Sequence, residues 1–400
     1  MPSVASGVPS PSPTPSPTPT PFPIPTALPT PSPGFEVPPV DANAATLVNL
    51  STGQVLFTLH PYAHRPIASV TKLMTALVVS EHAHPDDVVR VGQEAALEGS
   101  SGPGFSELGL QRGEHLTVRQ LLYALLLPSA NDAAVALADA VSGSSKRFVK
   151  LMNVEAGDLG LQGTRFYSPN GLDDRGYSTP HDLAAIAEEV FRVRFLEKIL
   201  QTKFRDIPSL GGPPRHVQNR NVLLWLYKGT LGGKTGYTEA AGYCLVAGAE
   251  RGGRRLLAVV LGEPTSEDSF TDVAALLNYG FHAFDRETVV DEDTRLSGLR
   301  VGDELLSVQT HAALRALVLA DVRTDPRVSL VAAKDARPPF RAGDRVGWVQ
   351  ATFQGELLGR APVFVAGVSA GASSRAEPWW EESVDLLVQV SSDVLHALFG

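Results

Sequence analysis

The sequence has few of the features that mark disulfide-stabilised, membrane-spanning or nucleic-acid-binding proteins. Cys244 is the only cysteine among 400 residues, so no intramolecular disulfide can form, and its apolar neighbours predict a buried structural thiol. No run of about 18 apolar residues occurs, so we expect no transmembrane helix. The net charge is −9 and no Lys/Arg block is present, so we expect no nucleic-acid partner. What remains is a globular chain whose 43% hydrophobic residues can build a sizeable core.

Residues 1–40 are rich in proline. They hold 15 of the 31 prolines, mixed with Ser and Thr, and Glu36 is their only charged residue. This composition buries little surface and supports neither helix nor sheet, so we expect a disordered, extended stalk. The segment lacks the charged start and apolar core of a signal peptide. If the protein is exported, we expect either a leader outside this sequence or a misplaced start site.

Residues 41–287 are predicted to form one domain of helices and strands. Thr117 and Gln120 indicate a capping box, and Thr179 with Pro180 indicates another helix start. Strands around these helices indicate an α+β fold, with an antiparallel sheet, rather than a doubly wound one. The predicted strands are 45–50, 55–59, 232–238, 242–250 and 255–262, and the other predicted helices are 69–81, 121–127, 131–141, 145–159 and 270–284.

The C-terminal part divides into three further segments. Alternating apolar and polar residues predict a small β-rich domain at 288–368. Residues 369–376 are rich in Ser, Gly and Ala and are predicted to be a linker. Residues 377–400 place apolar side chains on one helical face, which favours an amphipathic helix that contacts a membrane peripherally. The polar face of that helix is acidic, which favours packing on protein instead.

Three short motifs follow one another along the chain: Ser-x-x-Lys at Ser69 and Lys72, Ser-Ala-Asn at Ser129 and Asn131, and Lys-Thr-Gly from Lys234. The same set, with Ser-Asp-Asn in the middle, marks penicillin-binding proteins and class A β-lactamases. Each motif alone is weak, because a helix lysine, an N-cap serine and a glycine-rich strand entrance are all common. Their order and their predicted places, at a helix start, a helix break and a strand edge, make coincidence a poor explanation.

The spacing of the first motif suits nucleophilic catalysis. A serine must lose a proton to attack a carbonyl group, so it needs an adjacent base. One helical turn separates Ser69 from Lys72, which places both side chains on one face. Burial and a second cation, Lys234, would lower the pKa of Lys72 and let it act as that base.

Residues 40–368 resemble the low-molecular-mass penicillin-binding proteins, the serine-type D-alanyl-D-alanine carboxypeptidases. The resemblance implies an α+β fold with a transpeptidase-like domain, in which an antiparallel sheet is flanked by helices beside a helical subdomain, followed by a small β-rich domain. Beyond the three motifs, it rests on the segments at residues 66–68, 148–153, 170–173, 177–179, 219–221 and 237–243.

The resemblance also implies an activity and a location. The enzyme would remove the terminal D-Ala from peptidoglycan stem peptides ending in D-Ala-D-Ala, and β-lactams would inhibit it. It would act outside the cytoplasm, in the bacterial cell envelope. No metal or cofactor is implied.

The same resemblance assigns roles residue by residue. Ser69 would be acylated, Lys72 would be the base, and Ser129 would relay a proton to the leaving amine. The remaining roles are substrate binding, by Asn131, Lys234, Thr235, Gly236 and Tyr237, with the backbone N–H groups of Ser69 and Tyr237 as the oxyanion hole.

The sequence departs from the family pattern at one place, and it leaves several rival functions open. Some family members carry a carboxylate-binding arginine soon after the third strand, whereas the turn at 262–265 has none, which puts that contact in doubt. A class A β-lactamase needs a Glu-x-x-Asn element, but Tyr167 stands at that offset from Asn170, which predicts a stable penicilloyl-enzyme. Three further rivals are a DD-endopeptidase, a transpeptidase and a non-catalytic wall-binding protein.

Overall fold

The computed structural model describes residues 36–99, 106–320, 325–353 and 355–366. The predicted linker and C-terminal helix, and nearly all of the predicted stalk, lie outside these residues. The described chain forms two compact units. Unit 1 ends at Ala283, and unit 2 begins at Phe284 and also includes Thr52–Gln54. The domain boundary expected at residue 288 falls inside a strand, β10.

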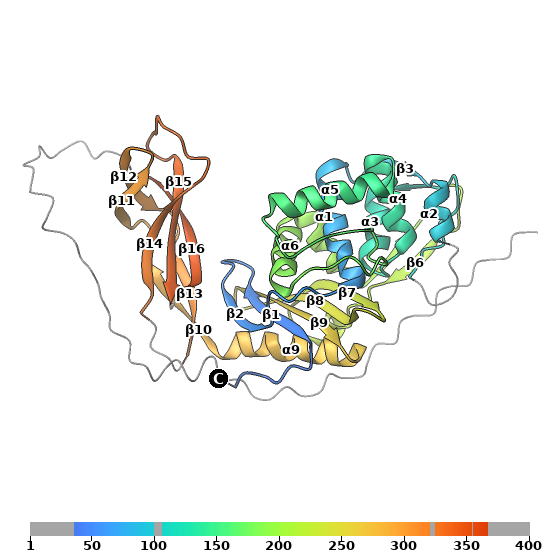
Figure 1. Cartoon of the computed structure of the whole chain (residues 1–400), viewed down its shortest axis with the longest axis horizontal. Coiled ribbons are helices and arrows are strands. Elements are labelled where there is room, and N and C mark those ends of the chain that lie inside the picture. The colour runs from blue at the N-terminus through green and yellow to red at the C-terminus, as the bar shows by residue number, and fades with distance from the viewer. Residues whose placement is uncertain (1–35, 100–105, 321–324, 354, 367–400) are drawn as a thin grey trace, which may run out of the picture. The chain divides into compact units, whose positions relative to one another are not determined.

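Unit 1 is built on a five-stranded antiparallel sheet in the order β2-β1-β9-β8-β7. One face of the sheet carries α9 and the other carries α6 and the helical region above it (Figure 1). Strand β7 is an edge strand, so one side of its backbone is available to an extended ligand. The strands of this sheet are β1 (Ala44–Asn49), β2 (Val55–Leu59), β7 (Thr230–Thr238), β8 (Gly242–Arg251) and β9 (Arg254–Glu263).

Helices make up most of the remaining secondary structure in the described part of unit 1. They are η1 (Ala68–Thr71), a 3₁₀ turn, and α1 (Lys72–His82), α2 (Gln93–Glu98), α3 (Val118–Leu126), α4 (Asn131–Ser142), α5 (Ser145–Asp158), α6 (Pro180–Arg192), α7 (Arg194–Leu200), α8 (Leu223–Leu226) and α9 (Ser266–His282). Two short antiparallel pairs complete it: β3 (Val88–Arg90) with β4 (His115–Thr117), and β5 (Phe204–Ile207) with β6 (Arg215–Gln218). No helix in the described ranges is long and apolar enough to cross a bilayer.

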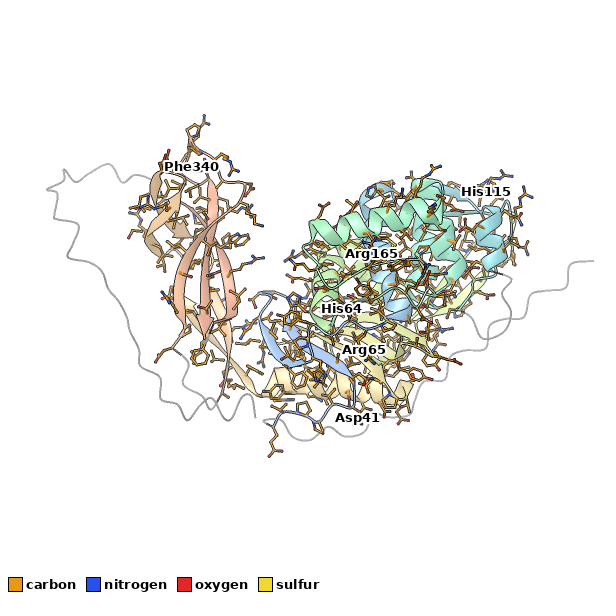
Figure 2. All side chains as sticks on the ribbon, in the orientation of Figure 1. Asp41, His64, Arg65, His115, Arg165 and Phe340 are labelled. Carbon is orange, nitrogen blue, oxygen red and sulfur yellow. The ribbon has the colours of Figure 1, made fainter. Side chains whose placement is uncertain are left out.

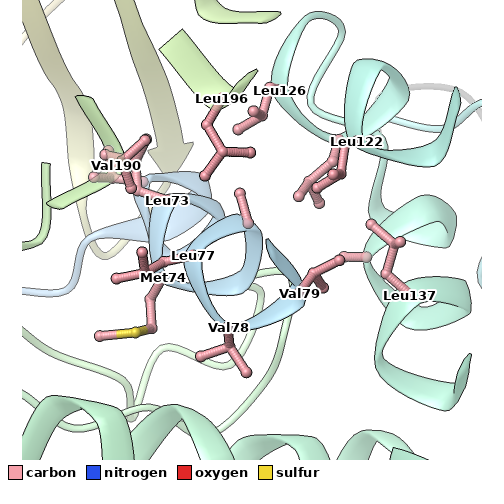
Figure 3. Packing of buried hydrophobic residues seen from close by; sticks show 14 of the residues in the cluster. Leu73, Met74, Leu77, Val78, Val79, Leu122, Leu126, Leu137, Val190 and Leu196 are labelled. Atoms are coloured by element: carbon pink, nitrogen blue, oxygen red, sulfur yellow. The ribbon is translucent and has the colours of Figure 1, made fainter. Parts of the chain in front are cut away.

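The centre of unit 1 is α1, which is largely apolar and whose residues from Lys72 to Val79 are all buried. A helix of this kind must be surrounded by other elements. Its side chains pack against leucine and valine side chains of α3, α4, α6 and α7 (Figure 3). Lys72, at the first position of this helix, is therefore held among fixed neighbours.

Several predicted boundaries shift in the structure. The helix expected from Ser69 begins as the 3₁₀ turn η1, and α1 itself starts at Lys72. The helix expected at 270–284 begins earlier, at Ser266, because Thr265 caps it and accepts from the Asp268 N–H. The capping box of Thr117 and Gln120 is confirmed, and so is the start of α6 at Thr179 and Pro180.

The described residues of unit 2 form strands and no helix, in two sheets with orders β10-β13 and β11-β12-β16-β15-β14. It has its own apolar core, which includes Val308, Val346, Val349 and Val363. The strands are β10 (Phe284–Val290), β11 (Arg295–Val301), β12 (Glu304–Thr310), β13 (Leu314–Leu319), β14 (Arg327–Ala332), β15 (Arg345–Phe353) and β16 (Glu356–Val365).

Candidate active site

Ser69 lies on η1, immediately before α1. The residue ahead of it, Ala68, has φ 46°, a conformation that non-glycine residues rarely adopt. Gly171 packs against this turn so closely that a Cβ there would lie 2.0 Å from the Ala68 oxygen. The turn is therefore clamped from outside, and it presents Ser69 one turn away from Lys72.

The chain that leads into η1 is fixed as well. Arg65 exchanges two backbone hydrogen bonds with Ser178, and the His64 ring stacks on Tyr177 with centroids 4.8 Å apart. His64 and Arg65 lie between the sheet and the helices (Figure 2). The segment that leads to Ser69 is therefore held in place by residues more than a hundred positions later in the chain.

The Lys72 side chain is fully buried and makes three hydrogen bonds. Its Nζ lies 2.8 Å from Ser69 Oγ, 2.8 Å from Asn131 Oδ1 and 2.7 Å from the carbonyl oxygen of Asn170. Burial, and then the Arg220 guanidinium, lower the pKa of Lys72 to about 7, while the Glu98 and Asp132 carboxylates act in the opposite direction. An amine with this pKa is substantially neutral near pH 7 and can accept a proton.

The second motif lies at the break between α3 and α4. Ser129 is buried with φ 70°, and its Oγ has no hydrogen-bond partner among the described residues. Asn131 is the first residue of α4, and its backbone N–H donates to the Ser106 oxygen at 2.7 Å. Ser129 Oγ therefore remains available to a ligand, whereas Asn131 Oδ1 accepts the hydrogen bond from Lys72.

The third motif lies on the edge strand β7. Lys234 is buried and its Nζ donates to the Thr235 carbonyl at 2.8 Å. Burial, followed by the charges of Lys72 and Arg220, lowers the pKa of Lys234 well below its usual value. A Cβ on Gly236 would lie 3.1 Å from the Ser69 backbone nitrogen, so glycine lets β7 approach the η1 turn. The structure thus brings Lys234 and Gly236 to the site that Ser69 and Lys72 occupy.

Tyr237 follows Gly236 on the same strand. It is 52% exposed, and the centroid of its ring lies 4.3 Å from that of the Tyr243 ring on β8. The Tyr237 side chain is therefore largely open to solvent.

The structure adds two charged residues, Arg220 and Glu98, that were not predicted as site residues. Arg220 lies close enough to influence the pKa of both Lys72 and Lys234. Its flanking residues, Asn219 and Asn221, are buried and hydrogen-bonded to the backbone, which fixes the segment. The Asn-Arg-Asn sequence was a visible signal for Arg220, whereas nothing local indicates Glu98.

Known proteins show a consistent likeness to this chain. The family described as D-alanyl-D-alanine carboxypeptidase (Peptidase_S11) matches residues 32–265. The D-alanyl-D-alanine carboxypeptidase DacC of Escherichia coli (strain K12) is 33% identical over 354 residues, covering 82% of this chain and 84% of that protein. DacF of Bacillus subtilis, with the same description, is 29% identical over 81% of this chain and 84% of its own.

Solved structures agree with these relatives. Penicillin binding protein 5 from Haemophilus influenzae superposes with a TM-score of 0.68 at 28% identity, over 84% of this chain and 99% of that one. A variant of the Streptomyces K15 DD-transpeptidase superposes with a TM-score of 0.58 at 35% identity, over 61% of this chain and 99% of that one.

Proposed function

This chain belongs to the D-alanyl-D-alanine carboxypeptidase family, and we propose that it removes the terminal D-alanine from peptidoglycan stem peptides with Ser69 as its nucleophile. One observation carries the proposal: Lys72, buried and with a pKa of about 7, lies 2.8 Å from Ser69 Oγ. A serine and a neutral base in this contact are what acyl transfer requires. β-Lactams would acylate the same serine and so act as inhibitors.

In the first step, Lys72 Nζ takes the proton of Ser69 as Ser69 Oγ attacks the carbonyl carbon of the penultimate D-Ala. The oxyanion would lie at the backbone N–H groups of Ser69 and Tyr237, and the close approach of Gly236 to the Ser69 nitrogen supports this placement. Negative charge that develops there is stabilised without any side chain having to move.

The C–N bond then breaks, and the amine of the terminal D-Ala leaves with a proton relayed by Ser129. The unpartnered Oγ of Ser129 supports this role. Water finally attacks the ester carbonyl, which releases the shortened peptide and restores the Ser69 hydroxyl.

The substrate is expected to lie as an extended strand along the edge of β7. Thr235 and Lys234 would hold its terminal carboxylate, with Asn131 on the opposite side of the cleft. The turn at 262–265 supplies no arginine to this end, so the positive charge available to the carboxylate comes from Lys234 and Arg220.

We further propose that the enzyme works in the extracytoplasmic cell envelope, where such peptides occur. Peripheral membrane contact through residues 377–400 stays a prediction, because those residues lie outside the described ranges. No part of the mechanism involves nucleic acid.

The test is covalent labelling by fluorescent penicillin, followed by D-Ala release from a D-Ala-D-Ala peptide. Wild type and Ser80→Ala, a control near the end of α1, should be labelled stably and release D-Ala. Ser69→Ala should do neither. Rapid loss of the label with hydrolysed drug would indicate a β-lactamase, and no labelling of folded wild type would contradict a catalytic Ser69.

A further inference from the structure

One of the three hydrogen bonds on the catalytic lysine comes from a loop, and that loop is held by a carboxylate on α2. Resting on the proposed function, we propose that Glu98 is a positioning residue for Lys72: by binding the Asn170 side chain, it holds the Asn170 carbonyl against the Lys72 amine. The hydrogen bond that links Glu98 to the site is the one from the Asn170 side chain. Glu98 acts on catalysis through Asn170 and through its charge.

The geometry of Asn170 supports this role. Its carbonyl oxygen accepts from Lys72 Nζ at 2.7 Å, and its Nδ2 donates to Glu98 Oε1 at 2.9 Å. Its Oδ1 accepts from the Leu172 N–H at 3.1 Å, so both ends of the amide are used. Asn170 is buried, and Glu98 is the group that anchors the amide from outside its own loop.

A second hydrogen bond also joins this loop to α1. Thr75, one turn after Lys72, donates through Oγ1 to the Pro169 carbonyl at 2.6 Å. Two successive loop carbonyls are therefore bound to one face of α1. Without Glu98, the Asn170 side chain loses its anchor on α2, so the Asn170 carbonyl can move relative to Lys72.

The charges around Lys72 give Glu98 a second effect. Glu98 from α2 and Asp132 from α4 favour the protonated amine, whereas Arg220, from the loop before α8, disfavours it; Lys234 on β7 is a further cation nearby. Acylation places a positive charge on Lys72 when the Ser69 proton arrives. The Glu98 carboxylate therefore stabilises the ammonium that this step creates.

Glu98 has its own electrostatic neighbours. Burial, Asp132 and Glu94 raise its pKa, while Lys72 and the hydrogen bond from Asn170 lower it. Burial, Asp132 and Glu98 in turn raise the pKa of Glu107. The proposal requires Glu98 to be ionised over the pH range in which Lys72 titrates. Replacing Glu98 by glutamine removes such a charge, so this variant tests the requirement.

The experiment uses three variants of the full chain. Glu98→Gln removes the charge and keeps an acceptor for Asn170. Glu98→Asp keeps the charge and withdraws the carboxylate from Asn170. Glu94→Gln, an exposed position on the same helix, is the matched control.

The first readout is the titration of the Lys72 amine by NMR of ¹³C-labelled lysine, assigned with Lys72→Arg. Glu98→Gln should lower the pKa of Lys72 by roughly half a unit to one unit, because an opposite charge nearby has been removed. Glu98→Asp should lower it less, and Glu94→Gln should leave it unchanged.

The second readout is single-turnover acylation by penicillin. The acid limb of the rate profile should move to lower pH in Glu98→Gln, by the same amount as the NMR titration. Glu98→Asp should acylate about tenfold more slowly at the plateau, with initial binding little changed, because misplacement of a base costs rate rather than affinity.

Three outcomes would overturn the proposal: an unchanged Lys72 titration in Glu98→Gln, an equal shift in Glu94→Gln, or wild-type acylation by Glu98→Asp. Failure of the proposed function is separate. It would appear as wild type that penicillin does not label, and the NMR titration, which needs no turnover, would then decide the role of Glu98 alone.

Discussion

The rate at which penicillin acylates Ser69 should depend on the protonation of Lys72. Burial and the Arg220 charge bring the pKa of Lys72 to about 7, and only the neutral amine can accept the serine proton. At pH 6 about one amine in ten is neutral, and at pH 8 about nine in ten are. The second-order acylation constant, which reports the free enzyme, should therefore rise about tenfold between pH 6 and pH 8.

Stopped-flow measurement with a fluorescent penicillin between pH 5.5 and pH 8.5 gives this constant directly. Lys72→Arg is the matched variant, because a guanidinium stays protonated across the whole range and should not support acylation at any pH. A wild-type constant that changes by less than about twofold between pH 6 and pH 8 would refute Lys72 as the titrating base. Acylation of Lys72→Arg at the wild-type rate would refute it as well.

Three further predictions follow from packing and burial. Gly236→Ala would place a Cβ 2.9 Å from the Ile67 carbonyl oxygen and 3.1 Å from the Ser69 nitrogen, so the backbone must shift; penicillin labelling of the folded variant should slow at least about tenfold, and the thermal unfolding midpoint should fall. Labelling at the wild-type rate would contradict it. Arg215→Met removes the charged partner of the fully buried Glu114 carboxylate, so urea denaturation should show a free energy of unfolding lower by about 3–5 kcal/mol. A decrease below about 1 kcal/mol would contradict this. Burial raises the pKa of the Cys244 thiol to about 12, so the folded protein should not react with a thiol reagent at pH 8 until it is unfolded.

Local sequence signals were enough to predict part of the fold. Thr117 with Gln120, and Thr179, satisfy free N–H groups of a helix start from within a few residues, and Pro180 has no N–H to satisfy, so the starts of α3 and α6 could be predicted. Short elements such as α2 and the β5–β6 pair were missed. They contain too few residues to be stable alone and depend on contacts made elsewhere in the chain.

The candidate site likewise contains contacts that the local sequence predicts and contacts that it does not. Ser69 and Lys72 are three residues apart, so their contact follows from helix geometry. The contacts of Lys72 with Asn131 and Asn170 span 59 and 98 residues, and only tertiary packing creates them. Tyr167 stands at the sequence offset where a class A β-lactamase has its carboxylate, whereas the carboxylate that reaches Asn170 comes from Glu98, 72 residues earlier.

The buried cations also make the base sensitive to the substrate. Lys72, Lys234 and Arg220 lie close enough together to affect one another's pKa, and the substrate expected there carries a carboxylate. A negative charge bound near these groups favours the protonated form of Lys72, so the pKa of Lys72 should be higher in the complex than in the free enzyme.

This difference can be measured, because kcat reports the complex and kcat/KM the free enzyme. For a peptide ending in D-Ala-D-Ala, the acid limb of kcat should therefore lie at higher pH than that of kcat/KM. For the same peptide with a C-terminal carboxamide, the two limbs should coincide. If they coincide for the carboxylate peptide too, the carboxylate does not lie beside Lys234 and Arg220, and the binding mode along β7 must be reversed or displaced.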